Sequence, residues 1–128
     1  MPYFADLTVY TFLPSEAEPK AYNVGWLDPT QEFERWIAPE RFVSALLRLT
    51  NTARVHQTRG WHVCAFCLAT GQPGTEETRG SYEIRVVAED GEVFLAPSLV
   101  HHYVAAHGNR PPVVFVNAVL FQARHEID

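Results

Sequence analysis

The chain has 128 residues, of which 47% are hydrophobic and 20% charged, a composition typical of a globular protein rather than a disordered one. Its length fits a single domain over residues 1–128, and its formal net charge of −5 argues against nucleic acid as a partner. It holds no apolar run near the ~20 residues that span a bilayer and no signal-peptide pattern, so we expect a protein of the reducing cytoplasm.

The N-terminal part of the chain predicts two extended segments and one helix. Residues Tyr3–Leu13 are rich in β-branched and aromatic side chains, which favours a strand. Tyr22–Leu27 is a second extended segment, closed by the turn sequence Asp28-Pro29. Residues Pro39–Asn51 predict a helix, because apolar side chains recur at helical spacing. These apolar positions are Phe42, Ala45, Leu46 and Leu49.

The middle of the chain is less regular. Val55–Cys67 is expected to be an irregular or short extended segment that ends in a turn at the Cys-x2-Cys sequence. Ala69–Gly80 is rich in Gly, Thr and Glu, which indicates an exposed loop. Tyr82–Val87 and Val93–Ala96 predict the two strands of a hairpin, because Asp90-Gly91 between them is typical of tight turns.

Two helices are expected in the last third of the chain. Ser98 is the predicted cap of a helix that ends at His107, with Gly108 directly after it. Pro111-Pro112 starts a final helix that runs through Arg124. The apolar face of this helix consists of Phe115, Val116, Val119 and Leu120. The pattern as a whole predicts an α+β fold in which a small antiparallel sheet is packed by about three helices.

The chain contains only two cysteines, Cys64 and Cys67, and further along it His102 and His107 form a His-x4-His pair. Two thiolates and two imidazoles at such spacings are the ligands of a structural zinc site. This site would join the Cys-x2-Cys turn to the helix that ends at His107. An ideal helix places residues five apart about 140° from each other, so the last turn, next to Gly108, has to loosen.

Other histidines compete for the same role. His101 is an alternative to His102, and His62 is an alternate ligand or a neighbour of the metal. His102 is favoured because it continues an apolar helix face, made by Leu99, Tyr103 and Ala106. The alternative is that these cysteines and histidines bind no metal and are ordinary core and surface residues.

A closed site is favoured over a catalytic one. The His-x-Glu and Pro-Cys-x-x-Cys sequences of zinc deaminases and the His-Glu-x-x-His helix of zinc proteases are absent from the chain. Glu83 or Asp90 could act as a base, but the sequence does not place either near the metal. Redox use of the cysteines would favour a helix N-terminus in a βαβ unit, which the surrounding sequence does not predict.

Three functions follow as hypotheses, in this order. The first is a non-enzymatic protein-interaction module, immunity-like, antitoxin-like or regulatory, with Trp26, Trp61 and Arg59 as a candidate partner surface. Most tryptophans of this kind are core anchors instead. The second is a zinc-dependent enzyme with a water on an open metal site. The third is a nucleic-acid-binding zinc domain, which would need a basic patch such as Arg41, Arg48, Arg54 and Arg59. The sequence leaves the oligomeric state open.

Several motifs together resemble a family of small uncharacterised bacterial proteins that share a domain of unknown function. The motifs are Asp-Leu at 6–7, Asn-Val-Gly-Trp-Leu-Asp at 23–28, His-x-Cys-x-x-Cys at 62–67, Glu-Ile-Arg-Val at 83–86, and His-Tyr-Val-x-x-His-Gly-x-x-Pro-Pro-x-x-Phe at 102–115. The resemblance implies a zinc-linked domain and supplies no activity. It also favours His102 and His107 over His101 as ligands. Asn109 stands where the family has an aromatic residue, a minor departure.

Overall fold

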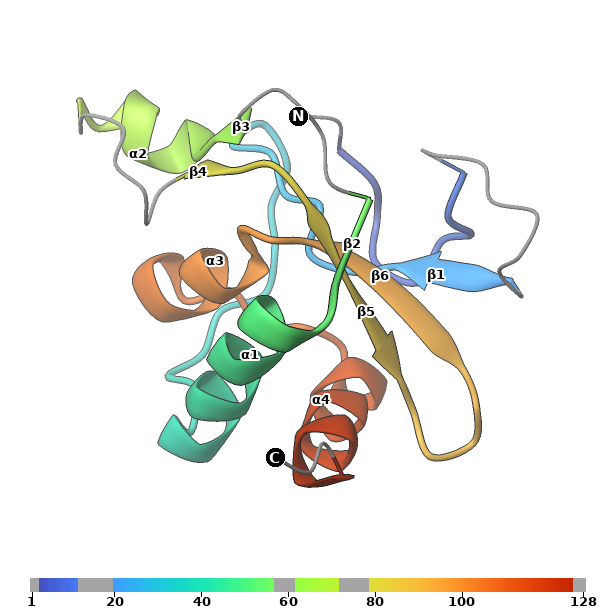
Figure 1. Ribbon diagram of the computed structural model, residues 1–128. Helices are drawn as coiled ribbons and strands as arrows, with labels where there is room; N and C mark the ends of the chain where they lie inside the picture. The colour runs from blue at the N-terminus through green and yellow to red at the C-terminus, as the bar shows by residue number, and fades with distance from the viewer. Residues whose placement is uncertain (1–2, 12–19, 57–61, 72–78, 126–128) are drawn as a thin grey trace.

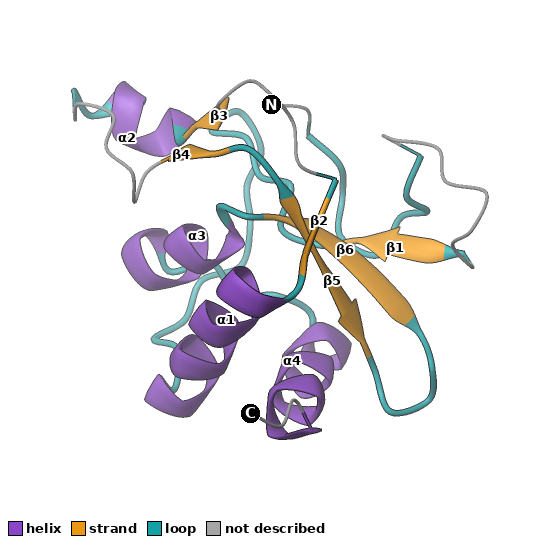
Figure 2. Ribbon diagram, viewed as in Figure 1, coloured by secondary structure: helices purple, strands orange, loops and turns teal. Residues whose placement is uncertain are grey.

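A computed structural model describes residues 3–11, 20–56, 62–71 and 79–125 (Figure 1). Its elements, in chain order, are β1 (Ala21–Asn23), α1 (Glu40–Thr52), β2 (Arg54–Val55), β3 (His62–Val63), α2 (Ala65–Ala69), β4 (Arg79–Gly80), β5 (Glu83–Val87), β6 (Val93–Pro97), α3 (Val100–His107) and α4 (Val113–His125). The fold is α+β, as predicted. Helices α1, α3 and α4 lie together on one side of the main sheet, and α2 lies apart from them beside β3 and β4 (Figure 2).

The main sheet has four strands in the order β1-β6-β5-β2. Strands β5 and β6 form the predicted antiparallel hairpin, with Glu83 opposite Pro97 and Val87 opposite Val93. Gly91 closes the turn at a positive φ of 90°, a conformation that glycine adopts without strain. The β1 strand pairs in parallel with β6, so the sheet is mixed rather than purely antiparallel. Strands β3 and β4 form a separate antiparallel pair.

The main core lies between this sheet and three helices. Alternate residues of the hairpin point toward the helices, as expected for strands with a period of two. The buried side chains are Ile84, Val86, Phe94 and Ala96 from the sheet, Phe42, Leu46 and Leu49 from α1, Val100 and Val104 from α3, and Phe115, Ala118 and Val119 from α4. Phe94 meets Phe115 edge to face, with ring centroids 5.9 Å apart. The apolar faces predicted for α1 and α4 are therefore the faces that pack.

The predicted strand over Tyr3–Leu13 is wrong for its described part. Residues 3–11 form no strand, and a single bridge joins Val9 to Tyr22. A turn intervenes at Leu7, whose φ is +67°, and the side chains of Leu7 and Val9 are 42% and 45% exposed. Strand propensity alone does not form a strand, because a strand also needs a continuous backbone partner.

The Asn-Val-Gly-Trp-Leu-Asp motif is explained by packing. Gly25 has a φ of +80°, and a Cβ there would lie 2.7 Å from Cγ2 of Val100, so glycine allows α3 to approach closely. Trp26 is only 2% exposed, and its indole N–H donates to the carbonyl of Leu95 over 3.0 Å. Trp26 is therefore a core anchor, and the expectation that it contributes to a partner surface is wrong.

The helix boundaries are partly as predicted. Helix α3 ends at His107, and Gly108 follows in the left-handed conformation with a φ of 71°. Its N-cap, however, is Leu99 rather than Ser98, and no side chain caps it. Helices α1 and α4 begin directly after Pro39 and Pro112, as expected from proline at helix starts. None of the helices in the described ranges is long and apolar enough to cross a membrane.

Candidate metal centre

Both cysteines lie at the start of α2. Cys64 is the N-cap residue and Cys67 belongs to the first turn, so the expected Cys-x2-Cys turn is the beginning of a short helix. The expectation that no helix N-terminus surrounds these cysteines is therefore wrong. The flanking strands β3 and β4 pair antiparallel, which differs from the parallel βαβ unit of thiol redox proteins.

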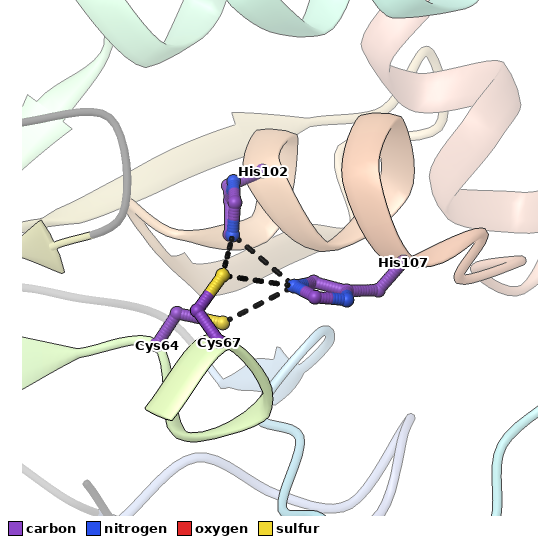
Figure 3. Close-up of side chains that lie close together, drawn as sticks. All are labelled: Cys64, Cys67, His102 and His107. Atoms are coloured by element: carbon purple, nitrogen blue, oxygen red, sulfur yellow. Dashed lines mark hydrogen bonds between the residues drawn. The ribbon is translucent and has the colours of Figure 1, made fainter. Parts of the chain in front are cut away.

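The four predicted ligand atoms converge on one point (Figure 3). Nε2 of His107 lies 3.4 Å from Sγ of Cys64, 3.5 Å from Sγ of Cys67 and 3.2 Å from Nε2 of His102. The distance from Sγ of Cys67 to Nε2 of His102 is 3.3 Å. All of these atoms lie within 4.8 Å of one another, so the group is close enough to hold a metal ion.

Four of the six distances between the donor atoms can be compared with those of a tetrahedron around zinc. With Zn–S bonds of about 2.3 Å and Zn–N bonds of about 2.0 Å, tetrahedral angles place two nitrogens about 3.3 Å apart and a sulfur and a nitrogen about 3.5 Å apart. The observed nitrogen pair and the three sulfur–nitrogen pairs fall within about 0.2 Å of these values. The donors present therefore fit a zinc ion in their chemistry and in these four distances.

The end of α3 is widened, which brings the two imidazoles together. The backbone N–H of Gly108 and that of Asn109 both donate to the carbonyl of Tyr103, five and six residues back, where an α-helical bond would span four. A wider turn reduces the angle between residues five apart. His107 therefore rotates toward the side of the helix that carries His102, as the sequence required.

The segment at residues 34–36 holds this widened end in place. The Arg35 guanidinium donates to the His107 carbonyl over 2.9 Å, and the Trp36 backbone N–H donates to the Gly108 carbonyl over 3.0 Å. The Trp36 indole N–H also donates to the Asn109 carbonyl over 2.9 Å. These bonds satisfy carbonyls that a helix leaves unpaired at its C-terminus, so the position of His107 is fixed from outside the helix.

The cluster sits in an apolar shell of its own. The buried residues around it are Leu27, Cys64, Cys67, Leu99 and Tyr103, with Phe33 and Phe66 packed against them. The Phe66 ring lies with its centroid 5.7 Å from that of Tyr103 and 5.2 Å from that of His107. Both sulfur-bearing residues are buried, and Cys64 is fully shielded from solvent. This shell is separate from the main core and joins α2 to α3.

Burial sets the protonation states in this shell. Burial raises the pKa of the Cys64 thiol, and the backbone amides of Cys67 and Phe66 act in the opposite direction. Burial and, next, the charge of Arg35 lower the pKa of His107. Both shifts act in a metal site: the lowered pKa favours the neutral imidazole of His107 that a metal requires, and a stable Cys64 thiolate needs the charge of a bound cation.

Two other histidines, His101 and His62, were considered as metal ligands. His101 does not belong to the cluster, and its Nε2 atom is buried without a hydrogen-bond partner in the described part of the chain. Adjacent residues point about 100° apart on a helix, so His101 and His102 face different surroundings. His62 lies in β3, but its side chain is outside the described residues, as are Arg59 and Trp61.

A second polar cluster was missed from the sequence. The Tyr10 hydroxyl donates to Oε1 of Glu83 over 2.8 Å, and Nδ1 of His56 lies 2.9 Å from the same oxygen. Glu83 is only 4% exposed, and His56 has a φ of +52°. These contacts tie the N-terminal segment to β5. Among the described residues no carboxylate joins the metal cluster, so neither Glu83 nor Asp90 lies in it.

Fold and site together define a small α+β protein with a Cys2His2 cluster able to hold a metal ion. The chain belongs to the family described as domain of unknown function DUF7919, which it matches over residues 2–120. This range covers the main sheet and all four cluster residues. No curated protein and no solved structure shows significant similarity to the chain.

Proposed function

We propose that Cys64, Cys67, His102 and His107 bind one zinc ion that has a structural role. The single observation that carries this proposal is that two sulfurs and two nitrogens lie within 4.8 Å of one another, as the donors of one metal ion must. Thiolates and imidazoles are the donors that zinc prefers in closed sites. Four side-chain donors complete a tetrahedron, whereas a catalytic zinc keeps a position for water. The closed donor set therefore favours a structural role over an enzymatic one.

The ion would attach a peripheral unit, β3-α2-β4, to the body of the protein. Helix α2 has five residues, and a helix that short is not stable without tertiary contacts. Its attachment consists of the cluster and the apolar shell with Leu99 and Tyr103 of the α3 region. The zinc ion would therefore decide whether this unit has a defined surface.

We further propose that this unit is the contact surface of a cytoplasmic protein-interaction module, immunity-like, antitoxin-like or regulatory. Two apolar residues of its described part are exposed: Leu68 is 55% exposed and Val63 is 36% exposed. Exposed apolar groups that lie close together are typical of protein contact sites. The acidic net charge of −5 also favours a protein partner over a polyphosphate.

Leu68→Asp tests the interaction proposal, because it places a charge on this surface and removes no ligand. We expect the variant to keep its zinc and its circular dichroism spectrum, and to lose partners that the wild-type protein captures from a lysate of its source organism. Leu47→Asp is the matched control, since Leu47 is 46% exposed on α1 and far from the cluster in sequence. Equal capture by both variants, or no specific capture by the wild type, would refute the proposed role and leave the zinc site standing.

A further inference from the structure

A basic hollow lies between α1 and α4, away from the metal centre. It has a volume of about 450 Å³, and three arginines, Arg41, Arg48 and Arg124, are among the residues that line it. Ser44 and the apolar residues Ala45, Leu120 and Ala123 line the rest of it. No acidic residue lines this hollow. Three cations thus gather on one surface of a chain whose net charge is −5.

Internal ion pairs do not account for the placement of Arg41 and Arg124. Arg41 and Arg124 form no ion pair with a carboxylate in the ranges that the structure describes, and both are exposed. Arg41 and Arg48 are seven residues apart on α1 and therefore lie on the same side, two turns apart. Like charges placed together destabilise a fold slightly, so their grouping is better explained by a ligand than by stability.

A second hollow of about 750 Å³ adjoins the first and shares Arg41, Leu120 and Arg124 with it. It extends to the β5–β6 turn, where Glu89, Asp90 and Glu92 provide acidic groups. Figure 1 shows α4 beside α1 with this hairpin on its other side. The surface is therefore basic toward α1 and acidic toward the hairpin, with the apolar side chains Val114 and Phe121 also lining it.

We propose that this surface binds an acidic segment of a partner protein, with carboxylates on Arg41 and Arg124 and an apolar side chain on Leu120. Arginine pairs with carboxylates through two parallel hydrogen bonds, which gives such a segment a defined orientation. A short acidic segment can lie on the basic side of the surface, next to α1. A long polyanion such as nucleic acid would extend beyond that side and meet the acidic β5–β6 turn, which would repel it. The surface needs neither the zinc ion nor Leu68, so this inference is independent of the function proposed above.

The test measures the fluorescence anisotropy of a labelled peptide made of repeated Glu-Glu-Leu units. We expect the peptide to bind the wild-type protein and to bind Arg41→Glu/Arg124→Glu at least about ten-fold more weakly, because like charges then face each other. Arg110→Glu is the matched control, since Arg110 is exposed but lies over the Trp36 ring rather than in the basic hollow. Leu68→Asp is expected to bind the peptide as the wild type does.

Three further probes distinguish an acidic segment from other ligands that this surface could bind. A Lys-Lys-Leu peptide should not bind, inorganic pyrophosphate should compete only weakly, and single-stranded DNA should not bind. If the double variant misfolds by circular dichroism, Arg41→Gln/Arg124→Gln replaces it. The proposal is overturned if the Glu-Glu-Leu peptide does not bind, or binds the double variant and the wild type equally. Tighter binding of pyrophosphate or DNA than of the peptide would overturn it in favour of a small-anion or nucleic-acid site.

Discussion

Cys64→Ala is expected to cause the largest loss of stability of any substitution considered for this chain. The change removes a fully buried sulfur ligand, and a zinc ion held by the remaining three donors binds far more weakly. Structural zinc contributes on the order of 10 kcal/mol to folding, which is comparable to the whole net stability of a domain. We expect the variant to unfold at a much lower temperature or to aggregate, as measured by circular dichroism and light scattering. A strong chelator should have the same effect on the wild-type protein.

Leu99→Ala is the matched control for this experiment. Leu99 is 2% exposed in the same apolar shell but supplies no ligand, so its truncation should lower the free energy of unfolding by about 2–5 kcal/mol. The control protein should still lose stability when the chelator is added, whereas Cys64→Ala should show no further response. If Cys64→Ala melts at the wild-type temperature, or if the chelator leaves the melting temperature of the wild-type protein unchanged, zinc does not stabilise this fold.

His102→Ala and His101→Ala are expected to differ sharply in metal content although the two residues are neighbours. Nε2 of His102 lies 3.3 Å from Sγ of Cys67, whereas His101 lies outside the cluster. Elemental analysis of the purified variants should find about one zinc per chain in His101→Ala and much less in His102→Ala, because only the second loses a ligand. Their zinc affinities, measured by competition with a chromophoric chelator, should differ by more than about ten-fold.

The opposite result would reassign the site. If His101→Ala loses the metal and His102→Ala retains it, His101 rather than His102 is the ligand. Wild-type zinc content in both variants would mean that neither imidazole is needed, and equally low content in both would mean that His101 also contributes to the site.

Local sequence patterns were sufficient for helices α1, α3 and α4 and for the hairpin. Phe42, Leu46 and Leu49 recur at helical spacing, and these are the residues that α1 buries. The Asp90-Gly91 turn and the end of α3 at Gly108 follow from the backbone conformations that glycine adopts easily. The cluster was predictable for a related reason, since two cysteines and two histidines at these spacings favour one common ion.

Pairings between distant segments were not predictable. The parallel pairing of β1 with β6 joins residues 21–23 to residues 93–95, and no local pattern encodes it. The strand expected at residues 3–13 has suitable side chains but meets β1 in a single bridge. Helix α2 was missed because it has only five residues and packs through Phe66 and Cys67 in an apolar shell formed by distant segments.

The charged surfaces also depend on the fold. A basic patch of Arg41, Arg48, Arg54 and Arg59 was considered from the sequence, but the structure instead brings Arg124 beside the first two. Arg54 lies over the Tyr82 ring, 4.3 Å from its centroid, and Arg59 is outside the described residues. Such groupings arise from the packing of α1 on α4, which the sequence does not specify locally.

X-ray absorption at the zinc edge of the purified protein is the most direct test of the central claim. The account predicts about one zinc per chain, coordinated by two sulfurs at about 2.3 Å and two imidazole nitrogens at about 2.0 Å. A first shell that lacks either donor type, or protein that stays folded and metal-free in the presence of zinc, would contradict it.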